Sequence, residues 1–139
     1  MRAFLDTNVF VYGLTQPESN SRKILGLAES GKIKVIVSEL VQREVVRVFR
    51  RIADDESAYN ALNYLARIAY IAPRRKINKQ MAELRGKIKD KDLENIATAR
   101  QQKLKFLVSY DKDYVGFKEY VTPKQFVKMI GLKPAATEY

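Results

Sequence analysis

Two short apolar runs in this chain each end in an aspartate. Residues 3–5 precede Asp6, and residues 106–110 precede Asp111. Runs of this length, bounded by turn-forming residues, are typical of buried strands rather than helices. An acid directly after a buried strand lies at its carboxyl end, where open parallel sheets place their ligand crevice. We therefore expect Asp6 and Asp111 to face one crevice.

The rest of the chain alternates between strand and helix patterns. The expected strands lie at about residues 2–5, 34–37, 69–72, 105–109 and 119–121. The expected helices lie at 21–30, from the cap Ser38 to about 52, from 54 to about 65, at 77–88 with a break near Gly86, at 91–102 with Asp90 as N-cap, and at 123–130 behind a capping box. Strands that alternate with helices predict a mainly parallel sheet with helices on both faces.

A chain of 139 residues suffices for one domain with its own core. We expect a single domain over residues 1–132. Residues 133–139 follow the last predicted helix and have the composition of a frayed end. The sequence shows no internal repeat, low-complexity block or linker.

The chain contains neither cysteine nor histidine. Without cysteine there is no disulfide framework and no thiolate chemistry. Without histidine the usual zinc sites, the Ser-His-Asp triad and the commonest general acid–base are excluded. Chemistry in this chain therefore depends on carboxylates, lysine, hydroxyls or a metal ion held by oxygen atoms.

The formal net charge is +10 and the sequence pI is about 9.8. Such an excess of positive charge favours a polyanionic partner such as nucleic acid. Ion-pair networks on a heat-adapted surface would give a similar composition.

No apolar run approaches the ~20 residues of a membrane span. Asp6 interrupts the first apolar stretch, so we expect a cytoplasmic protein without a secretory signal.

Glu44 lies inside the apolar stripe of the helix predicted after Ser38. It stands four residues after Leu40 and four before Val48, so it faces the packed side, whereas the arginines of this helix lie on the outer face. A carboxylate on a buried face is unfavourable unless it is paired or bound to a metal ion. A buried ion pair with an arginine is the alternative reading.

Two further acids follow the same logic. Asp92 lies on the helix face that also carries Ile96 and Ala99, so it points toward the packed side. Asp111 and Asp113 follow the second buried run. Asp113 fits an ordinary turn, and Asp111, closer to the strand, is the better ligand.

Four carboxylates are therefore expected at one crevice, those of Asp6, Glu44, Asp92 and Asp111. Taken alone, each also fits a cap, a turn or an ion pair. Clustered carboxylates cannot all ionise easily without a cation, and oxygen ligands without nitrogen or sulfur suit Mg²⁺ or Mn²⁺. In a strongly basic protein this combination indicates a divalent-metal site that handles nucleic acid.

The ordered set of these segments resembles the PIN-domain family, as found in VapC-type toxins and other small prokaryotic PIN proteins. The matching segments span nearly the whole chain in the family's order: residues 4–8, Ser38 with Glu44, Asp92 with residues 96–99, residues 107–113 and residues 121–126. The chain departs from the family pattern at Asn95, where an aliphatic residue is common, and at Tyr110, where a small residue is common.

The resemblance implies a three-layer α/β/α sandwich with a central, mainly parallel five-stranded sheet, and cleavage of RNA that depends on Mg²⁺ or Mn²⁺. It implies catalytic and metal-ligand roles for Asp6, Glu44, Asp92 and Asp111, and a supporting place at the metal for Asp113. It also implies a homodimer or higher homo-oligomer and, for a toxin, an antitoxin protein as partner.

Other residues are expected to support such a site. Four polar side chains would orient ligands or phosphate: Thr7, Asn8, Asn95 and Ser109. Six basic residues are candidates to hold RNA, although a solvated surface would explain each one equally: Arg43, Arg47, Arg74, Arg75, Lys76 and Lys112. Three tyrosines would suit stacking on unpaired bases of single-stranded RNA or packing in the core: Tyr12, Tyr110 and Tyr114.

Three functions fit these observations. The first is a metal-dependent ribonuclease that cuts within RNA, as the toxin of a toxin–antitoxin pair. The second is a catalytically inactive PIN scaffold that binds RNA or protein. The third is a phosphatase with Asp6 as nucleophile, but Asn8 stands where a haloacid-dehalogenase-like enzyme carries its second aspartate. The presence of all four acids favours the first.

Overall fold

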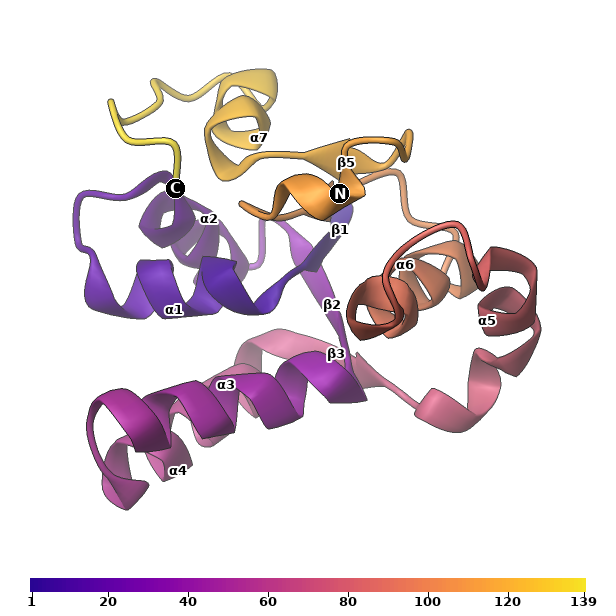
Figure 1. Cartoon of the computed structure of the whole chain (residues 1–139). Coiled ribbons are helices and arrows are strands. Elements are labelled where there is room, and N and C mark those ends of the chain that lie inside the picture. The colour runs from indigo at the N-terminus through magenta and orange to yellow at the C-terminus, as the bar shows by residue number, and fades with distance from the viewer.

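The chain folds around a five-stranded parallel sheet with the strand order β3-β2-β1-β4-β5, and the computed structural model describes all residues, 1–139 (Figure 1). The strands are β1 (Arg2–Leu5), β2 (Lys34–Ser38), β3 (Ala69–Ala72), β4 (Leu107–Val108) and β5 (Tyr120–Val121). The helices are α1 (Thr7–Thr15), α2 (Asn20–Glu29), α3 (Glu39–Ile52), α4 (Asp55–Ile68), α5 (Asn78–Leu84), α6 (Asp90–Gln101) and α7 (Pro123–Met129). Two 3₁₀ turns, η1 (Arg74–Lys76) and η2 (Lys112–Tyr114), complete the set.

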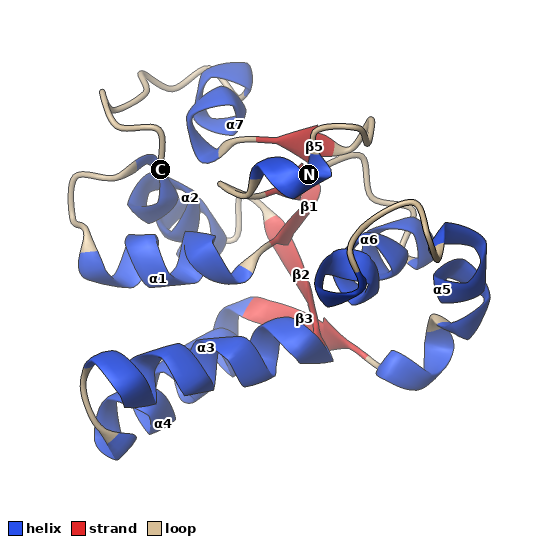
Figure 2. Ribbon diagram, in the orientation of Figure 1, coloured by secondary structure: helices blue, strands red, loops and turns tan.

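The helices form a layer on each face of the sheet. The chain steps from β1 to β2 to β3 in one direction, and then returns across β1 to β4. Because crossovers between parallel strands are right-handed, this reversal sends α5 and α6 to the face opposite α1 to α4. Figures 1 and 2 show α5 and α6 on one side and α1 to α4 with α7 on the other. The predicted three-layer α/β/α sandwich is confirmed.

The sheet is the centre of the core. Phe4 of β1 lies in register with Ile36 of β2 on one side and Leu107 of β4 on the other, and all three are buried. Strands covered on both faces must be apolar on both faces, which is why the apolar runs of the sequence do not alternate with polar residues. No helix has the length and apolar character needed to span a lipid bilayer.

Several helix starts follow the sequence signals. The Ser38 hydroxyl accepts the Val41 N–H at the start of α3, and the Asp54 carboxylate caps α4. At α7 the side chains of Thr122 and Gln125 form the predicted capping box. These local bonds satisfy N–H groups that the first helical turn leaves without partners.

Helix α1 was not predicted. Asp6 is its N-cap and accepts the Thr7 N–H at 2.8 Å, so this acid ends a strand and begins a helix at once. Gly13, a poor helix former, obscures the pattern. The structure requires glycine there, because an added Cβ would lie 2.4 Å from the Leu25 side chain of α2. The helix is therefore held by packing on α2 rather than by local propensity.

Other predicted boundaries differ from those observed. Asp90 is not an N-cap, because it is the first residue of α6; Lys89 takes the cap position without a side-chain bond. The helix predicted over 77–88 ends at Leu84, before Gly86 with its positive φ of 85°. Strands β4 and β5 have two residues each, shorter than expected, because only those residues pair in the ladder.

The segment 133–139 is not a frayed end, because it folds back onto α2 (Figure 1). The Asn20 side chain, fully buried, donates to the Thr137 carbonyl and accepts the Ala135 N–H, each at 2.7 Å. The Asn20 backbone N–H donates to the Tyr139 carbonyl at 2.9 Å. We call this set of bonds the Asn20 clasp. It pairs polar groups that the interior would otherwise leave unsatisfied.

Replacing Asn20 by alanine is expected to lower the free energy of unfolding by about 1–3 kcal/mol, because the variant loses the side-chain bonds of the clasp to the Ala135 N–H and the Thr137 carbonyl. Urea denaturation measures the loss, and amide hydrogen exchange in residues 133–139 should become faster. Asn63→Ala is the matched control: Asn63 is exposed on α4 and makes no side-chain hydrogen bond, so its change should stay within about 0.5 kcal/mol. Unchanged exchange in the tail of Asn20→Ala would contradict the clasp.

Candidate metal centre

The four acids singled out in the sequence meet in one cleft of about 340 Å³. They come from four places in the fold: Asp6 after β1, Glu44 on α3, Asp92 on α6 and Asp111 after β4. The cleft opens at the carboxyl ends of β1 and β4, between the two strands where the winding of the sheet reverses. Helices leave this point toward opposite faces, so the fold leaves a crevice there.

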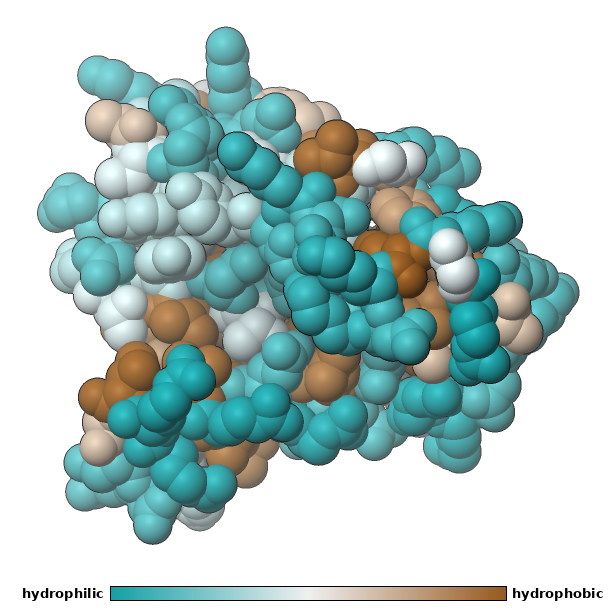
Figure 3. Space-filling view, in the orientation of Figure 1, coloured by the Kyte–Doolittle hydropathy of each residue, from teal (hydrophilic) through white to brown (hydrophobic).

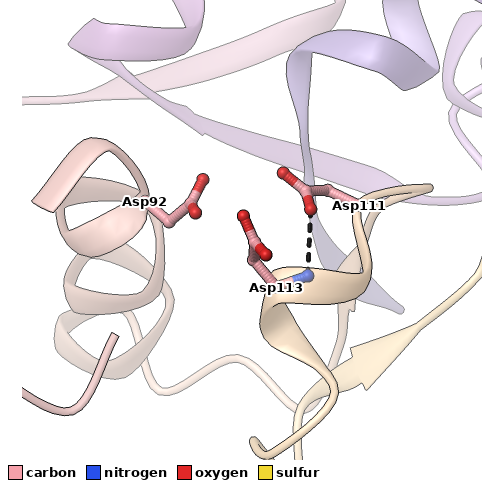
Figure 4. A group of neighbouring side chains, drawn as sticks. All are labelled: Asp92, Asp111 and Asp113. Atoms are coloured by element: carbon pink, nitrogen blue, oxygen red, sulfur yellow. Dashed lines mark hydrogen bonds between the residues drawn. The ribbon is translucent and has the colours of Figure 1, made fainter. Parts of the chain in front are cut away.

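The closest group of acids contains Asp92, Asp111 and Asp113. One carboxylate oxygen from each lies within 4.8 Å of the others. Figure 4 shows Asp92 of α6 facing Asp111 and Asp113, which stand together at η2. The Asp111 carboxylate accepts the Asp113 N–H at 2.9 Å and thereby caps that turn. Asp6 and Glu44 line the same cleft outside this closest group.

Asp6 is buried, with 6% of its surface exposed. Its carboxylate accepts bonds from the Thr7 N–H at 2.8 Å, the Ser109 hydroxyl at 2.6 Å and the Asn95 amide at 3.2 Å. Burial raises its pKa to about 6 against the effect of these donors, and the charges of Glu44 and Asp111 add to the rise. The cleft therefore stabilises the ionised form of Asp6 only in part.

A buried chain of hydrogen bonds joins Asp6 to Asp92. The Ser38 hydroxyl donates to Asn95 at 2.6 Å, and the Asn95 amide donates to Asp6 and to the Tyr114 hydroxyl. Tyr114 in turn donates to Asp92 at 3.3 Å. Burial raises the pKa of Tyr114, so its hydroxyl stays a donor. Tyr114 has no exposed surface, so its predicted role in stacking on bases is wrong.

Glu44 is half-buried and points into the cleft rather than into the sheet. The Thr7 hydroxyl donates to its Oε1 at 3.2 Å, and Glu44 forms no ion pair. The alternative of a buried Glu–Arg pair is therefore wrong. Burial raises the pKa of Glu44, and the charge of Asp92 adds to this rise.

Three of the predicted supporting residues bond directly to the acids, namely Thr7, Asn95 and Ser109, whereas Asn8 reaches them only through Ser109. The Ser109 hydroxyl, besides donating to Asp6, accepts the Asp111 N–H at 2.9 Å and an Asn8 amide hydrogen at 3.4 Å. Asn8 also accepts the Tyr110 N–H at 3.1 Å. The ends of β1 and β4 are thus tied together beneath the acids, which limits how far Asp6 and Asp111 can move apart.

Lys91 is a cation of the site that the sequence analysis missed. Its ammonium lies 3.0 Å from Asp92, 3.3 Å from Asp111 and 3.0 Å from Asp113. Partial burial disfavours the charged lysine, but hydrogen bonds to Asp113 and Asp92 outweigh this and raise its pKa. The sequence does contain a signal for this role, because Lys91 stands between two acids, Asp90 and Asp92. Burial raises the pKa of Asp92 despite this partner.

The predicted basic residues divide into two groups. Arg43 and Arg74 each approach the buried Glu94 at 3.8 Å and so have an internal partner. The others are exposed and form no ion pair: Arg47, Arg75, Lys76 and Lys112. Arg51 was not predicted but lines the cleft itself. Positive charge therefore borders the acidic cleft.

A larger groove of about 730 Å³ lies among α1, α3 and α4. It is lined by apolar side chains that include Leu14, Phe49 and Ile52. In Figure 3 brown, apolar atoms gather over the lower left of the molecule, where α3 and α4 lie. This groove contains no carboxylate, so metal chemistry belongs to the smaller cleft.

The donor set of the smaller cleft fits a hard divalent cation. Its candidate ligand atoms are carboxylate oxygens, which calcium, magnesium and manganese prefer. Burial raises the pKa values of Asp6, Glu44 and Asp92, and neighbouring acids add to the rise, so their ionised forms are only partly stabilised. A bound cation would supply compensating positive charge.

Comparisons with known proteins agree with this architecture. A toxin–antitoxin complex from Klebsiella pneumoniae matches with a TM-score of 0.68 and 23% identity, over 87% of this chain and 97% of the other. VapBC2 from Rickettsia felis, bound to a DNA fragment from its promoter, matches with a TM-score of 0.64 and 19% identity, over 88% and 97%. Mycobacterium tuberculosis VapC20, a sarcin–ricin loop cleaving toxin, matches with a TM-score of 0.64 and 16% identity, over 82% and 93%.

At these identities the structural likeness shows a shared fold. No curated protein matches the sequence significantly. The family comparison is more specific, because a family model described as the PIN domain matches residues 2–113 and therefore includes the four acids that line the cleft and also Asp113. Since this match covers most of the chain and agrees with the observed fold, the protein belongs to the PIN-domain family.

Proposed function

We propose that this protein is a metal-dependent ribonuclease that hydrolyses phosphodiester bonds within RNA. The observation that carries the proposal is the convergence of Asp92, Asp111 and Asp113 within 4.8 Å, in a cleft that Asp6 and Glu44 also line. This acidic cleft belongs to a protein with a net charge of +10. Such a charge distribution suits a cation in the cleft and a polyanion around it.

The proposed cofactor is Mg²⁺ or Mn²⁺, held by Asp6, Glu44, Asp92 and Asp111 with help from Asp113. When bound, a divalent cation lowers the pKa of water and offsets the charge that develops on phosphate. The chain itself must hold the displaced proton on a carboxylate, because it has no histidine. Glu44 suits this role, since burial raises its pKa and only its Oε1 accepts a hydrogen bond.

The proposed substrate is RNA, in single-stranded form. Arg51 lines the cleft, and the exposed residues Arg47, Arg75, Lys76 and Lys112 are free to bind phosphates. Thr7 and Asn8 would orient ligands or phosphate at the cleft wall.

The resemblance in fold to toxins solved in toxin–antitoxin complexes supports a toxin role, an antitoxin partner and a homodimer or higher homo-oligomer as parts of the proposal. A cytoplasmic location is also part of it.

One observation favours a second candidate, a PIN scaffold that binds RNA or protein without cutting. Lys91 already places an ammonium among the three closest acids. If this internal cation cannot be displaced, the protein would bind no metal ion and would have no activity. The predictions below separate the two functions.

Asp92→Asn and Glu44→Gln are expected to reduce Mn²⁺-dependent RNA cleavage at least about a hundredfold, because each removes a charge that holds the cation or accepts a proton. Sequencing the 5′ ends of RNA fragments measures cleavage and locates the cut sites. Asp55→Asn, an exposed acid of α4, is the matched control and should cut like the wild type. A wild type that cuts none of a varied set of RNAs would leave the scaffold as the function.

Mn²⁺ affinity is expected to fall as pH drops through 6. The pKa of Asp6 is raised from 3.8 to about 6, so below that pH the metal-free protein holds a proton that the cation must expel. One displaced proton gives about a tenfold loss of affinity per pH unit. Isothermal titration calorimetry from about pH 7.5 to about pH 5 measures the profile, and Asp6→Asn should flatten it. An affinity that stays constant across this range would exclude Asp6 as a ligand.

Lys91→Met is expected to bind Mn²⁺ about tenfold more tightly than the wild type, because the lysine no longer competes for Asp92, Asp111 and Asp113. The metal-free variant should also unfold at lower urea concentration, since the acids lose the one cation that contacts all three of them, and Lys89 pairs with Asp113 alone. Lys87→Met, an exposed residue without ion pairs, is the control. Binding by Lys91→Met but not by the wild type would favour the scaffold, and weaker binding would show that Lys91 assists the metal.

A further inference from the structure

Three tyrosines from distant parts of the chain meet beside the acidic cleft: Tyr12 of α1, Tyr110 after β4 and Tyr139 of the tail. The rings of Tyr12 and Tyr139 are stacked, with centroids 4.1 Å apart and planes 12° apart. Tyr110 stands nearly perpendicular to both, with its centroid 5.8 Å from each. We call these residues the tyrosine cluster.

The tyrosine cluster borders the acids directly. Tyr12 lines the acidic cleft together with Asp6 and Asp111. Tyr110 precedes Asp111 in the chain, and its N–H is held by Asn8, another cleft residue. A phosphate bound at the acids would therefore have its neighbouring nucleotides near these rings.

Tyr12 and Tyr139 are each partly exposed, and the third ring does not extend their stack. Because Tyr110 is equally distant from the two stacked rings, it lies beside the pair and not on top of either ring. The outer faces of Tyr12 and Tyr139 are thus not covered by the third tyrosine. One more planar ring can extend the stack, and an unpaired nucleobase has that shape.

The cluster also differs from the buried tyrosine of the site. Tyr114 has no exposed surface and a hydroxyl bonded to Asn95 and Asp92, whereas Tyr110 is 39% exposed. The hydroxyls of the cluster make no hydrogen bond within the protein, and none is a buried polar atom without a partner. They therefore face solvent, as expected for rings at a binding surface rather than in a core.

The tail brings Tyr139 to this position through its backbone. The Asn20 clasp binds the carbonyls of Thr137 and Tyr139 and the N–H of Ala135, and does not involve the Tyr139 ring. A fully buried asparagine thus serves to place a segment whose aromatic side chain stands at the cleft. The Tyr139 ring therefore contacts Tyr12 and Tyr110 at the cleft, and its loss would leave the bonds of the clasp in place.

From this arrangement we propose that Tyr12, Tyr110 and Tyr139 form a stacking site for an unpaired base of the RNA held at the acidic cleft. The inference rests on the proposed ribonuclease function and deepens it by naming a base-binding subsite. It also predicts a preference for single strands, because bases in a duplex already stack on one another and cannot reach an aromatic side chain.

The chain has no tryptophan, so Tyr139→Trp introduces a single indole reporter at the stack. Titration with a short single-stranded RNA of mixed sequence, in EDTA and at low salt so that the RNA stays intact, should quench its fluorescence. An abasic oligonucleotide of equal length and a fully paired duplex should not. Tyr59→Trp, at an exposed tyrosine of α4, is the control and should report no quenching.

Affinity gives the second measurement. Tyr139→Leu and Tyr110→Leu should weaken binding of the same single-stranded RNA about tenfold and leave binding of the abasic oligonucleotide unchanged. Tyr139→Phe keeps the ring and should bind like the wild type, as should Tyr59→Leu. Because the Asn20 clasp holds the tail backbone, Tyr139→Leu should retain the wild-type hydrogen exchange of residues 133–139.

The outcomes separate the two proposals. RNA binding by the wild type that the leucine variants leave unchanged, or an indole that RNA does not quench, would show that the cluster only packs the tail. Equal losses of affinity for RNA and for the abasic oligonucleotide would also overturn the stacking site, because they would reflect contacts with the sugar-phosphate backbone alone. A wild type that neither binds nor cuts RNA would overturn the ribonuclease function together with the stacking site.

Discussion

The burial of several carboxylates side by side in one cleft governs the properties of the site. Burial and neighbouring negative charge raise the pKa values of Asp6 and Glu44, and Asp92 shows the same effect of burial. Such an arrangement lowers the stability of the fold unless positive charge compensates for it. Lys91 compensates in part, by approaching Asp92, Asp111 and Asp113. A divalent cation, as proposed for this cleft, would offset the same negative charge.

The sheet makes this arrangement possible. β1 is the central strand, and the reversal of winding beside it opens the cleft between β1 and β4. Asp6 both ends β1 and caps α1, so the backbone fixes its position. The bonds from Ser109 and Asn95 then hold its carboxylate from two other elements. A rigid apolar sheet thus supports a polar site that would not hold its shape alone.

The sequence predicted much of this because the signals were local. Short apolar runs marked the strands, and the capping residues Ser38, Asp54 and Thr122 marked three helix starts. Spacing within a helix placed Asp92 on the packed side, where it is buried. Helix α1 was not predicted, because Gly13 weakens the helical pattern. The reason for this glycine, its close packing on Leu25, cannot be read from the sequence. Asp90 was misplaced by one position, since local propensity does not fix the first residue of a helix.

Local patterns suffice to predict the alternating elements, the parallel sheet and the acids at its carboxyl ends, because periodicity and caps act over a few residues. Which side chains meet depends on the packed fold. It placed Lys91 among the acids, buried Tyr114 between Asn95 and Asp92, and brought Tyr139 to Tyr12 across most of the chain. Those contacts depend on how the helices pack and on where the tail folds back, and no pattern of neighbouring residues contains that information.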